Sequence, residues 1–133
     1  MHVLTGILLV LCLFSIGCTT EGPSEVTAPP IVSWLTKPDT LSYSFTVQNY
    51  SVYEDRAVTF TRDTVLVYLA VSNYGGGSAV LTLYNGSHAT ISSYPLAGVS
   101  AQTLTIAVRP AYCSISMDHW SGSAAILVTG KVP

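Results

Sequence analysis

Hydrophobic and polar residues alternate through much of the chain from about residue 41 onward. In 41–48, LSYSFTVQ, apolar or aromatic side chains occupy every second position, and Ser, Thr or Gln occupies the others. A period of two places successive side chains on opposite faces of a β-strand, so this segment is predicted to be a strand with one buried face. The run TVLVYLAVS at 64–72 is apolar on both faces and is predicted to be a central strand. The other predicted strands are 79–84, 88–94, 101–108, 112–117 and 123–129.

Short turn signals separate these segments. Asn85-Gly86 is a dipeptide favoured in two-residue hairpin turns, and Ser121-Gly122 marks a further turn. The segment NYGGGS at 73–78 is predicted to be a flexible hairpin or crossover loop. Seven or eight short strands at this spacing, without helical periodicity, predict an all-β domain built as an antiparallel two-sheet sandwich. A small β-barrel is the alternative, because strand patterns alone do not separate the two architectures.

The N-terminal segment differs from the rest of the chain. Residues 3–17, VLTGILLVLCLFSIG, carry no charge, but this run is shorter than the roughly 20 residues that a transmembrane helix needs. An apolar run of this length that ends in small residues is typical of a secretory signal peptide. The polar segment TTEGPSEVTAPP that follows Cys18 has no hydrophobic period and is predicted to be a flexible tether. The predicted organisation is a signal peptide at 1–17, a tether at 18–33 and one β domain at 34–133.

The end of the apolar run, Ser15-Ile16-Gly17-Cys18, resembles the lipobox of bacterial lipoproteins, in which a small residue precedes an obligatory cysteine. The resemblance implies that Cys18 becomes the first mature residue, carries a diacylglyceryl group and is acylated on its new amine. Several acyl chains make membrane attachment durable, whereas a single chain binds only marginally. The family also implies a cell-envelope location, with the outer membrane favoured because Thr19 is not the aspartate that marks inner-membrane retention in enteric bacteria. Ordinary secretion and an uncleaved anchor are the alternatives.

Composition excludes some functions. Charged residues make up only 9% of the chain, and the net charge of −2 comes without a run of either sign. A nucleic-acid binder needs a basic patch to displace counterions from phosphates, so nucleic acid is not predicted as a partner. Cys113 is the one cysteine in the predicted domain, and it shares a strand face with Ile115 and Met117. It is expected to be a buried, inert thiol, with a reactive or intermolecular thiol as the alternative.

Signs of catalysis are weak. Ser87-His88 and Asp118-His119 contain residue types found in hydrolytic sites, but adjacent strand residues point to opposite faces unless the chain bends. The chain also has no G-x-S-x-G motif. No catalytic residue and no cofactor are therefore predicted.

Metal binding is no better supported. After processing, the chain would hold few cysteine and histidine ligands, which disfavours a zinc site. Glu54-Asp55 with Asp63 would form at most a loose calcium site, and a solvated charged turn explains them more simply. No metal site is predicted.

Aromatic residues are the remaining candidates for binding. Sugar rings present apolar C–H faces that stack on exposed aromatic side chains, and core packing accounts for most of the two tryptophans and eight tyrosines. Trp34, Tyr74 and Trp120 are the ones whose burial is least certain, although Trp120 could instead plug one end of the sandwich. The predicted function is thus a non-catalytic interaction or structural role in the envelope. Glycan or peptidoglycan binding is the alternative, and an enzyme is the weakest one.

Overall fold

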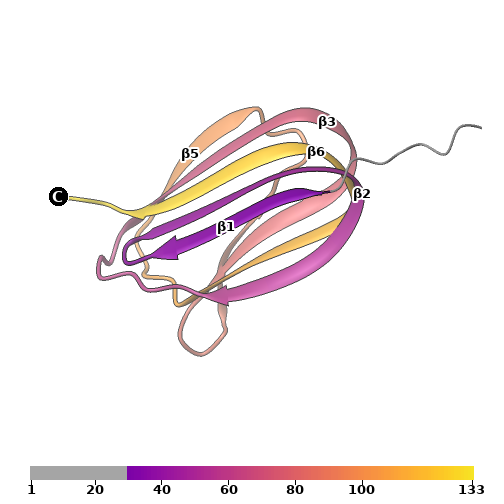
Figure 1. Cartoon of the computed structure of the whole chain (residues 1–133). Coiled ribbons are helices and arrows are strands. Elements are labelled where there is room, and N and C mark those ends of the chain that lie inside the picture. Colours follow the sequence, from indigo (N-terminus) through magenta and orange to yellow (C-terminus); the bar gives the residue numbers. More distant parts are fainter. Residues whose placement is uncertain (1–29) are drawn as a thin grey trace, which may run out of the picture.

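The computed structural model describes residues 30–133, and these residues form strands and loops without a helix. No segment of this part of the chain is therefore a helix that could cross a membrane. The predicted signal peptide, Cys18 and most of the predicted tether lie outside the described residues. The strands are β1 (Ile31–Lys37), β2 (Thr40–Ala57), β3 (Val65–Tyr84), β4 (Thr90–Pro95), β5 (Ala101–Ile106) and β6 (Tyr112–Gly130) (Figure 1).

All neighbouring strands pair antiparallel, which confirms the predicted all-β antiparallel class. The hydrogen-bonded order is β1-β2-β6-β3-β4, and β5 also pairs with β3. β1 begins at Ile31, whereas the predicted domain begins at Trp34. Its alternation is carried mainly by Val32 and Trp34, a signal too short to mark a strand by itself.

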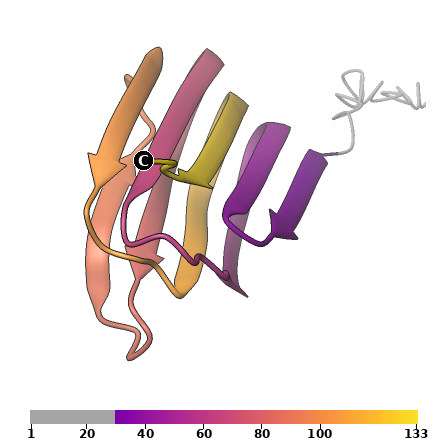
Figure 2. The ribbon, with the colours of Figure 1, turned by 90° about the vertical axis from the view of Figure 1, so that its left-hand side faces the viewer.

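The three longest strands each bend and contribute to two layers (Figures 1 and 2). β2, β3 and β6 have 18, 20 and 19 residues, and their pairing shifts register near the middle of each strand. We call layer A the part formed by β1, β5, the first halves of β2 and β3, and the second half of β6. Layer B consists of β4 and the remaining halves of the long strands. This arrangement is compatible with the predicted sandwich, but one continuous sheet supplies both layers.

The bends explain why the described chain has six strands and not seven or eight. The predicted strands 64–72 and 79–84 are both parts of β3, and the predicted loop between them is wrong. Likewise, Ser121-Gly122 lies within β6 and does not end a strand. Gly77 has φ 83° and Gly122 has φ 144°, a conformation that glycine adopts without strain, so the strands bend at these points and continue.

The turn at Asn85-Gly86 is also longer than predicted. Neither residue has the positive φ that a two-residue type I′ turn requires, and β4 starts at Thr90. The backbone N–H of His88 donates to the Asn85 carbonyl at 3.0 Å, and the Asn85 side-chain oxygen accepts from the Ala89 backbone N–H at 2.9 Å. The Asn85 side chain therefore stabilises a wider loop, in which His88 has φ 58°.

The hydrophobic core lies between the two layers. The alternating residues of the predicted strand at 41–48 all face this core, as their period requires: Leu41, Tyr43, Phe45 and Val47 are buried. Cys113 is fully buried in β6, which confirms the predicted burial. Burial raises the pKa of its thiol to about 12, with a smaller contribution from the negative charge of Asp55, so the thiol is protonated at neutral pH.

Candidate functional site

Two of the three predicted binding aromatics pack against each other at the bends. The Trp120 ring is fully buried, and its centroid lies 4.8 Å from that of Tyr74. Tyr74 is 46% exposed, and its hydroxyl donates to the Gly77 carbonyl at 2.9 Å. The expectation that Trp120 presents an exposed ring is therefore wrong, because β6 bends after it and the indole fills that end of the core. The buried Trp120 agrees with the alternative prediction that this side chain plugs one end of the sandwich.

The third predicted aromatic, Trp34, lies where edge strand β1 faces the second half of β2. It packs edge-on against Tyr43 at 4.5 Å between ring centroids, and the Arg56 guanidinium lies over it at 5.3 Å. The Trp34 Nε1, the Tyr43 hydroxyl and one Glu54 carboxylate oxygen are buried without hydrogen-bond partners. Burial, and then the charge of Glu54, raise the pKa of Tyr43. Because Arg56 covers the Trp34 ring, this indole does not form an open stacking surface.

A different group of aromatic rings lies on the outer face of layer B. We call Tyr53, Tyr84, His88 and Tyr112 the tyrosine patch. Tyr84 and Tyr112 are direct partners on neighbouring strands, and the His88 ring stacks on Tyr112 at 3.7 Å between centroids with an interplanar angle of 29°. The His88 Nε2 also lies 3.5 Å from the Asp55 carboxylate, and Tyr53 is 64% exposed.

Hydroxyl groups connect the two ends of the tyrosine patch. The Tyr84 hydroxyl lies 3.2 Å from that of Ser114, which is buried beneath the patch. The pKa of Tyr53 is raised, first by partial desolvation and then by the nearby Tyr84 and Asp55, while the Ser114 hydroxyl acts in the opposite direction. The sequence alone does not predict this patch, because the alternation assigns each residue to a face but does not say which strands are neighbours.

The outer face of layer A has a different character. We call the outward side chains of the described segments 31–36, 40–48, 65–73, 101–106 and 121–129 the neutral face, because these segments contain no charged residue. Lys37, the last residue of β1, lies at the border of this face. One row across its strands contains the large residues Leu35, Leu127 and Tyr68, which are 47%, 37% and 37% exposed. The next row contains only small side chains: Ser33, Ser44, Ala125, Ala70 and Ala101.

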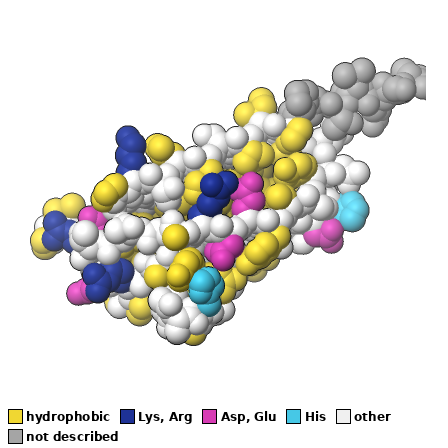
Figure 3. Space-filling model, turned by 60° about the horizontal axis from the view of Figure 1, so that its bottom comes forward, with side chains coloured by type: hydrophobic (Ala, Val, Ile, Leu, Met, Phe, Trp, Pro, Cys, Tyr) yellow, Lys and Arg dark blue, Asp and Glu magenta, His cyan; other side chains and the backbone are white. Residues whose placement is uncertain are grey.

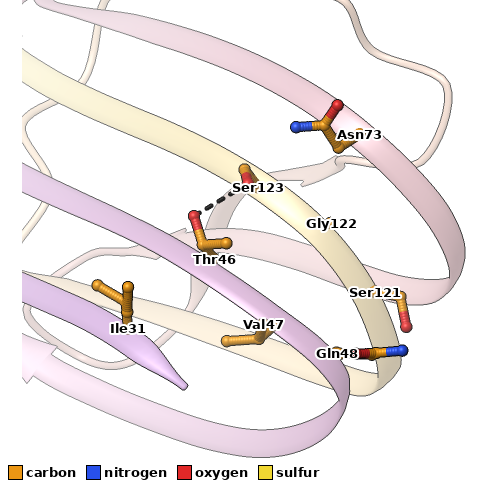
Figure 4. Close-up of a pocket in the computed structure, with 8 residues that line it drawn as sticks. All are labelled: Ile31, Thr46, Val47, Gln48, Asn73, Ser121, Gly122 and Ser123. Atoms are coloured by element: carbon orange, nitrogen blue, oxygen red, sulfur yellow. Dashed lines mark hydrogen bonds between the residues drawn. The ribbon is translucent and has the colours of Figure 1, made fainter. Parts of the chain in front are cut away.

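Three adjoining hollows of about 370, 410 and 350 Å³ follow the neutral face. The first lies near the bends, where Ile31 and Gln48 are at its rim and the hydroxyls of Thr46 and Ser123 are 2.9 Å apart (Figure 4). Ile31 also lines the second hollow and is 69% exposed. The row of small residues thus forms a shallow trough beside a ridge of larger ones.

The serine and histidine residues considered for catalysis, all of which the structure describes, do not form a catalytic triad. The chain does bend at His119, whose φ is 48°, so that its Nδ1 lies 2.7 Å from the Asp118 carboxylate. The Ser51 hydroxyl, however, donates to Asp118 at 3.4 Å and accepts the His119 backbone N–H at 2.8 Å. This serine is therefore bonded to the carboxylate and not to the imidazole that would have to take its proton. The Ser87 hydroxyl is likewise bonded to the side chain of Asn85 and not to His88.

The three acidic residues considered for calcium do not converge. Each lies near a different basic or imidazole group, and no group of three or more potential metal ligands occurs among residues 30–133. The pairs are Glu54–Arg56 at 3.9 Å, Asp55–His88 at 3.5 Å and Asp63–Arg109 at 3.8 Å.

Comparisons with known proteins find only weak structural similarities. No family model matches the sequence, and no curated protein matches it significantly. A chain of the Bacillus endospore appendages, which form a novel family of disulfide-linked pili, is 16% identical with a TM-score of 0.45, covering 79% of this chain and 94% of its own. The Schizosaccharomyces pombe Cnp3 cupin domain is 11% identical with a TM-score of 0.39, and the match covers 83% of this chain and 66% of that one.

The capsular polysaccharide assembling protein CapF from Staphylococcus aureus is also similar. It is 11% identical with a TM-score of 0.39, and the match covers 82% of this chain and 30% of that protein. Likenesses this weak do not assign a family or a function.

Proposed function

We propose that this chain is a lipid-anchored, non-catalytic structural protein of a bacterial cell envelope, and that its β domain associates with a second copy of itself through the neutral face. The observation that carries the self-association is the combination of exposed large apolar side chains and a broad surface of layer A without charge, which Lys37 at the end of β1 borders. Exposed apolar patches of this kind mark interaction sites in soluble domains.

Two features favour a second copy as the partner. A two-fold interface brings the same surface of both copies together, so any charged residue near its axis meets a like charge, and the neutral face avoids this. The face also offers a ridge and a trough in adjacent rows. When one copy is turned over onto the other, Leu127 and Tyr68 of one copy can lie in the trough that Ala70 and Ala125 form in the other.

The area of the neutral face is sufficient for such a contact. With strands about 4.8 Å apart and a rise of about 3.3 Å per residue, five strand segments of roughly seven residues cover about 550 Å². Two copies would then bury a total surface on the order of 1,100 Å², if the face is treated as flat. This area is close to the lower range of specific interfaces.

The proposed attachment to the membrane rests on the N-terminal sequence. The uncharged run 3–17 followed by Cys18 supports cleavage before this cysteine and its acylation. The polar residues after Cys18 would form the short tether. The outer membrane is the favoured location, and secretion without a lipid is the alternative.

Sedimentation velocity of the full-length protein in detergent tests the self-association. Ala125→Lys places a charge at the centre of the trough, and we expect it to shift the dimer to monomer, because the lysine would be desolvated against the apolar ridge of the other copy without a partner charge. Ser116→Lys is the matched control: it adds the same charge to an exposed position of the same strand, on the outer face of layer B. A wild-type protein that is monomeric at all accessible concentrations, or an Ala125→Lys variant that dimerises normally, would refute the proposed contact.

A further inference from the structure

We propose that the tyrosine patch binds a neutral oligosaccharide, because the exposed Tyr53 ring and the exposed His88 ring, which is stacked on Tyr112, lie on either side of the Asp55 carboxylate on the outer face of layer B. This inference goes beyond the proposed self-association and does not depend on it, since the two surfaces lie on opposite sides of the domain.

Tyr53 and His88 supply the two accessible rings, because the His88 ring covers Tyr112. Tyr53 is opposite Ser116 of β6, and Tyr112 lies four residues earlier on the same strand, opposite Tyr84 of β3. Two accessible rings carried by different rows of the sheet favour a ligand of linked sugar rings over a single sugar. Tyrosine suits such a ligand, because its ring packs against C–H groups while its hydroxyl remains available for hydrogen bonds.

The Asp55 carboxylate lies between the two accessible rings. It is midway between the row of Tyr53 and the row of Tyr112, and its partner on β6, Ser114, is buried beneath it. The Asp55 carboxylate is 31% exposed and can accept strong hydrogen bonds from sugar hydroxyls.

His88 holds part of this arrangement in place. Its ring is stacked on Tyr112 and its Nε2 lies near Asp55, so it links one aromatic end of the patch to the central carboxylate. The wide loop after Asn85 makes this contact possible, because it brings His88 back over β6. A negative charge at the centre of the patch disfavours acidic sugars, which is why we assign the ligand to the neutral class.

Titration calorimetry or NMR of the full-length protein in detergent tests this inference. The probes are cellohexaose, chitohexaose and maltohexaose as neutral oligosaccharides, and oligogalacturonate as the acidic comparison. We expect saturable binding of at least one neutral probe, and a loss of affinity on the order of tenfold in Tyr53→Ala, because a stacking surface is removed. Tyr53→Phe keeps the ring and should retain most of the affinity.

Tyr68→Ala is the matched control, since it removes a partly exposed tyrosine from the neutral face. It should bind the probe like the wild type, and so should Ala125→Lys, which separates this inference from the self-association. Tyr53 is mostly exposed, so its replacement should leave the unfolding transition unchanged. Failure of all three neutral probes to bind, stronger binding of oligogalacturonate, or equal affinity in Tyr53→Ala would overturn the proposal.

Discussion

Cys113 shows how a single buried group links the core to the pH of the surroundings. Its thiol lies between the two layers, where ionisation would place a charge in an apolar environment, and burial raises its pKa to about 12. In the unfolded chain the same thiol loses its proton near pH 8.5. Between these two values the unfolded state binds fewer protons than the folded state, so raising the pH favours unfolding.

We therefore expect the free energy of unfolding to fall above about pH 8.5, by up to about 1.4 kcal/mol per pH unit from this group. Urea titrations between about pH 8 and 10 measure the slope, a range chosen because Tyr43, whose pKa is also raised, adds to it only above about pH 10. Cys113→Ala should make the free energy of unfolding depend less steeply on pH in this range. The smaller side chain should also lower the free energy of unfolding by the same amount at every pH. An unchanged slope in this variant would show that Cys113 does not titrate on unfolding as described.

At the scale of the elements, β3 and β6 reach both layers because they bend without ending. Gly76 of β3 is paired with Ser121 of β6, so the two bends lie side by side and the strands remain neighbours through the turn. At Gly77 the backbones of β3 and β6 lie so close that a Cβ at this position would overlap the carbonyl of His119 and the backbone nitrogen of Trp120. The bend therefore depends on a residue without a side chain.

Gly77→Ala is expected to destabilise the domain by at least about 2 kcal/mol, because it combines backbone overlap with an unfavourable φ of 83°. Gly86→Ala is the control, since its φ is not positive and a Cβ there has open space; it should change stability by less than about 0.5 kcal/mol. Both are measured by urea unfolding followed by tryptophan fluorescence. If the two variants unfold at the same urea concentration, the close approach of β3 and β6 is not as described.

The strand pattern was readable from the sequence, but the bends were not. Alternation correctly predicted that Tyr43 and Phe45 face the core, because a period of two follows from local backbone geometry. The glycines at 75–77 resemble a loop when only local sequence is considered, and their role follows from pairing with a distant strand. The burial of Trp120 has the same origin, since the bend of β6 turns its ring inward. The candidate binding residues were therefore partly misplaced, and the tyrosine patch required the register of β2, β6 and β3.

At the scale of the whole molecule, the two ends of the domain differ. β1 begins at the end where the long strands bend, and the C-terminus lies at the opposite end (Figure 1). Most of the basic side chains visible in Figure 3 gather toward one end. Arg62 and Lys131 line a common hollow there, and Arg109 pairs with the neighbouring Asp63, beside the C-terminal residues. These three basic residues thus lie far from the start of β1, where the proposed tether joins the domain.

The uneven distribution of basic residues between the two ends of the domain leads to a prediction about how the protein is held at a membrane. Electrostatic attraction to anionic lipids would require basic residues near the anchored end and would weaken in high salt, whereas acyl chains hold through buried CH₂ groups and do not. We therefore expect the wild-type protein to remain in the membrane fraction of a bacterial host after a high-salt wash, with an intact mass that shows a missing leader and added lipid. Cys18→Ala should lose both the lipid and the membrane fractionation, while Cys113→Ala, which also removes one thiol, should keep them. Release of the wild type by salt, or an unmodified Cys18 in its intact mass, would contradict the lipid anchor and leave secretion as the explanation of the apolar N-terminal run.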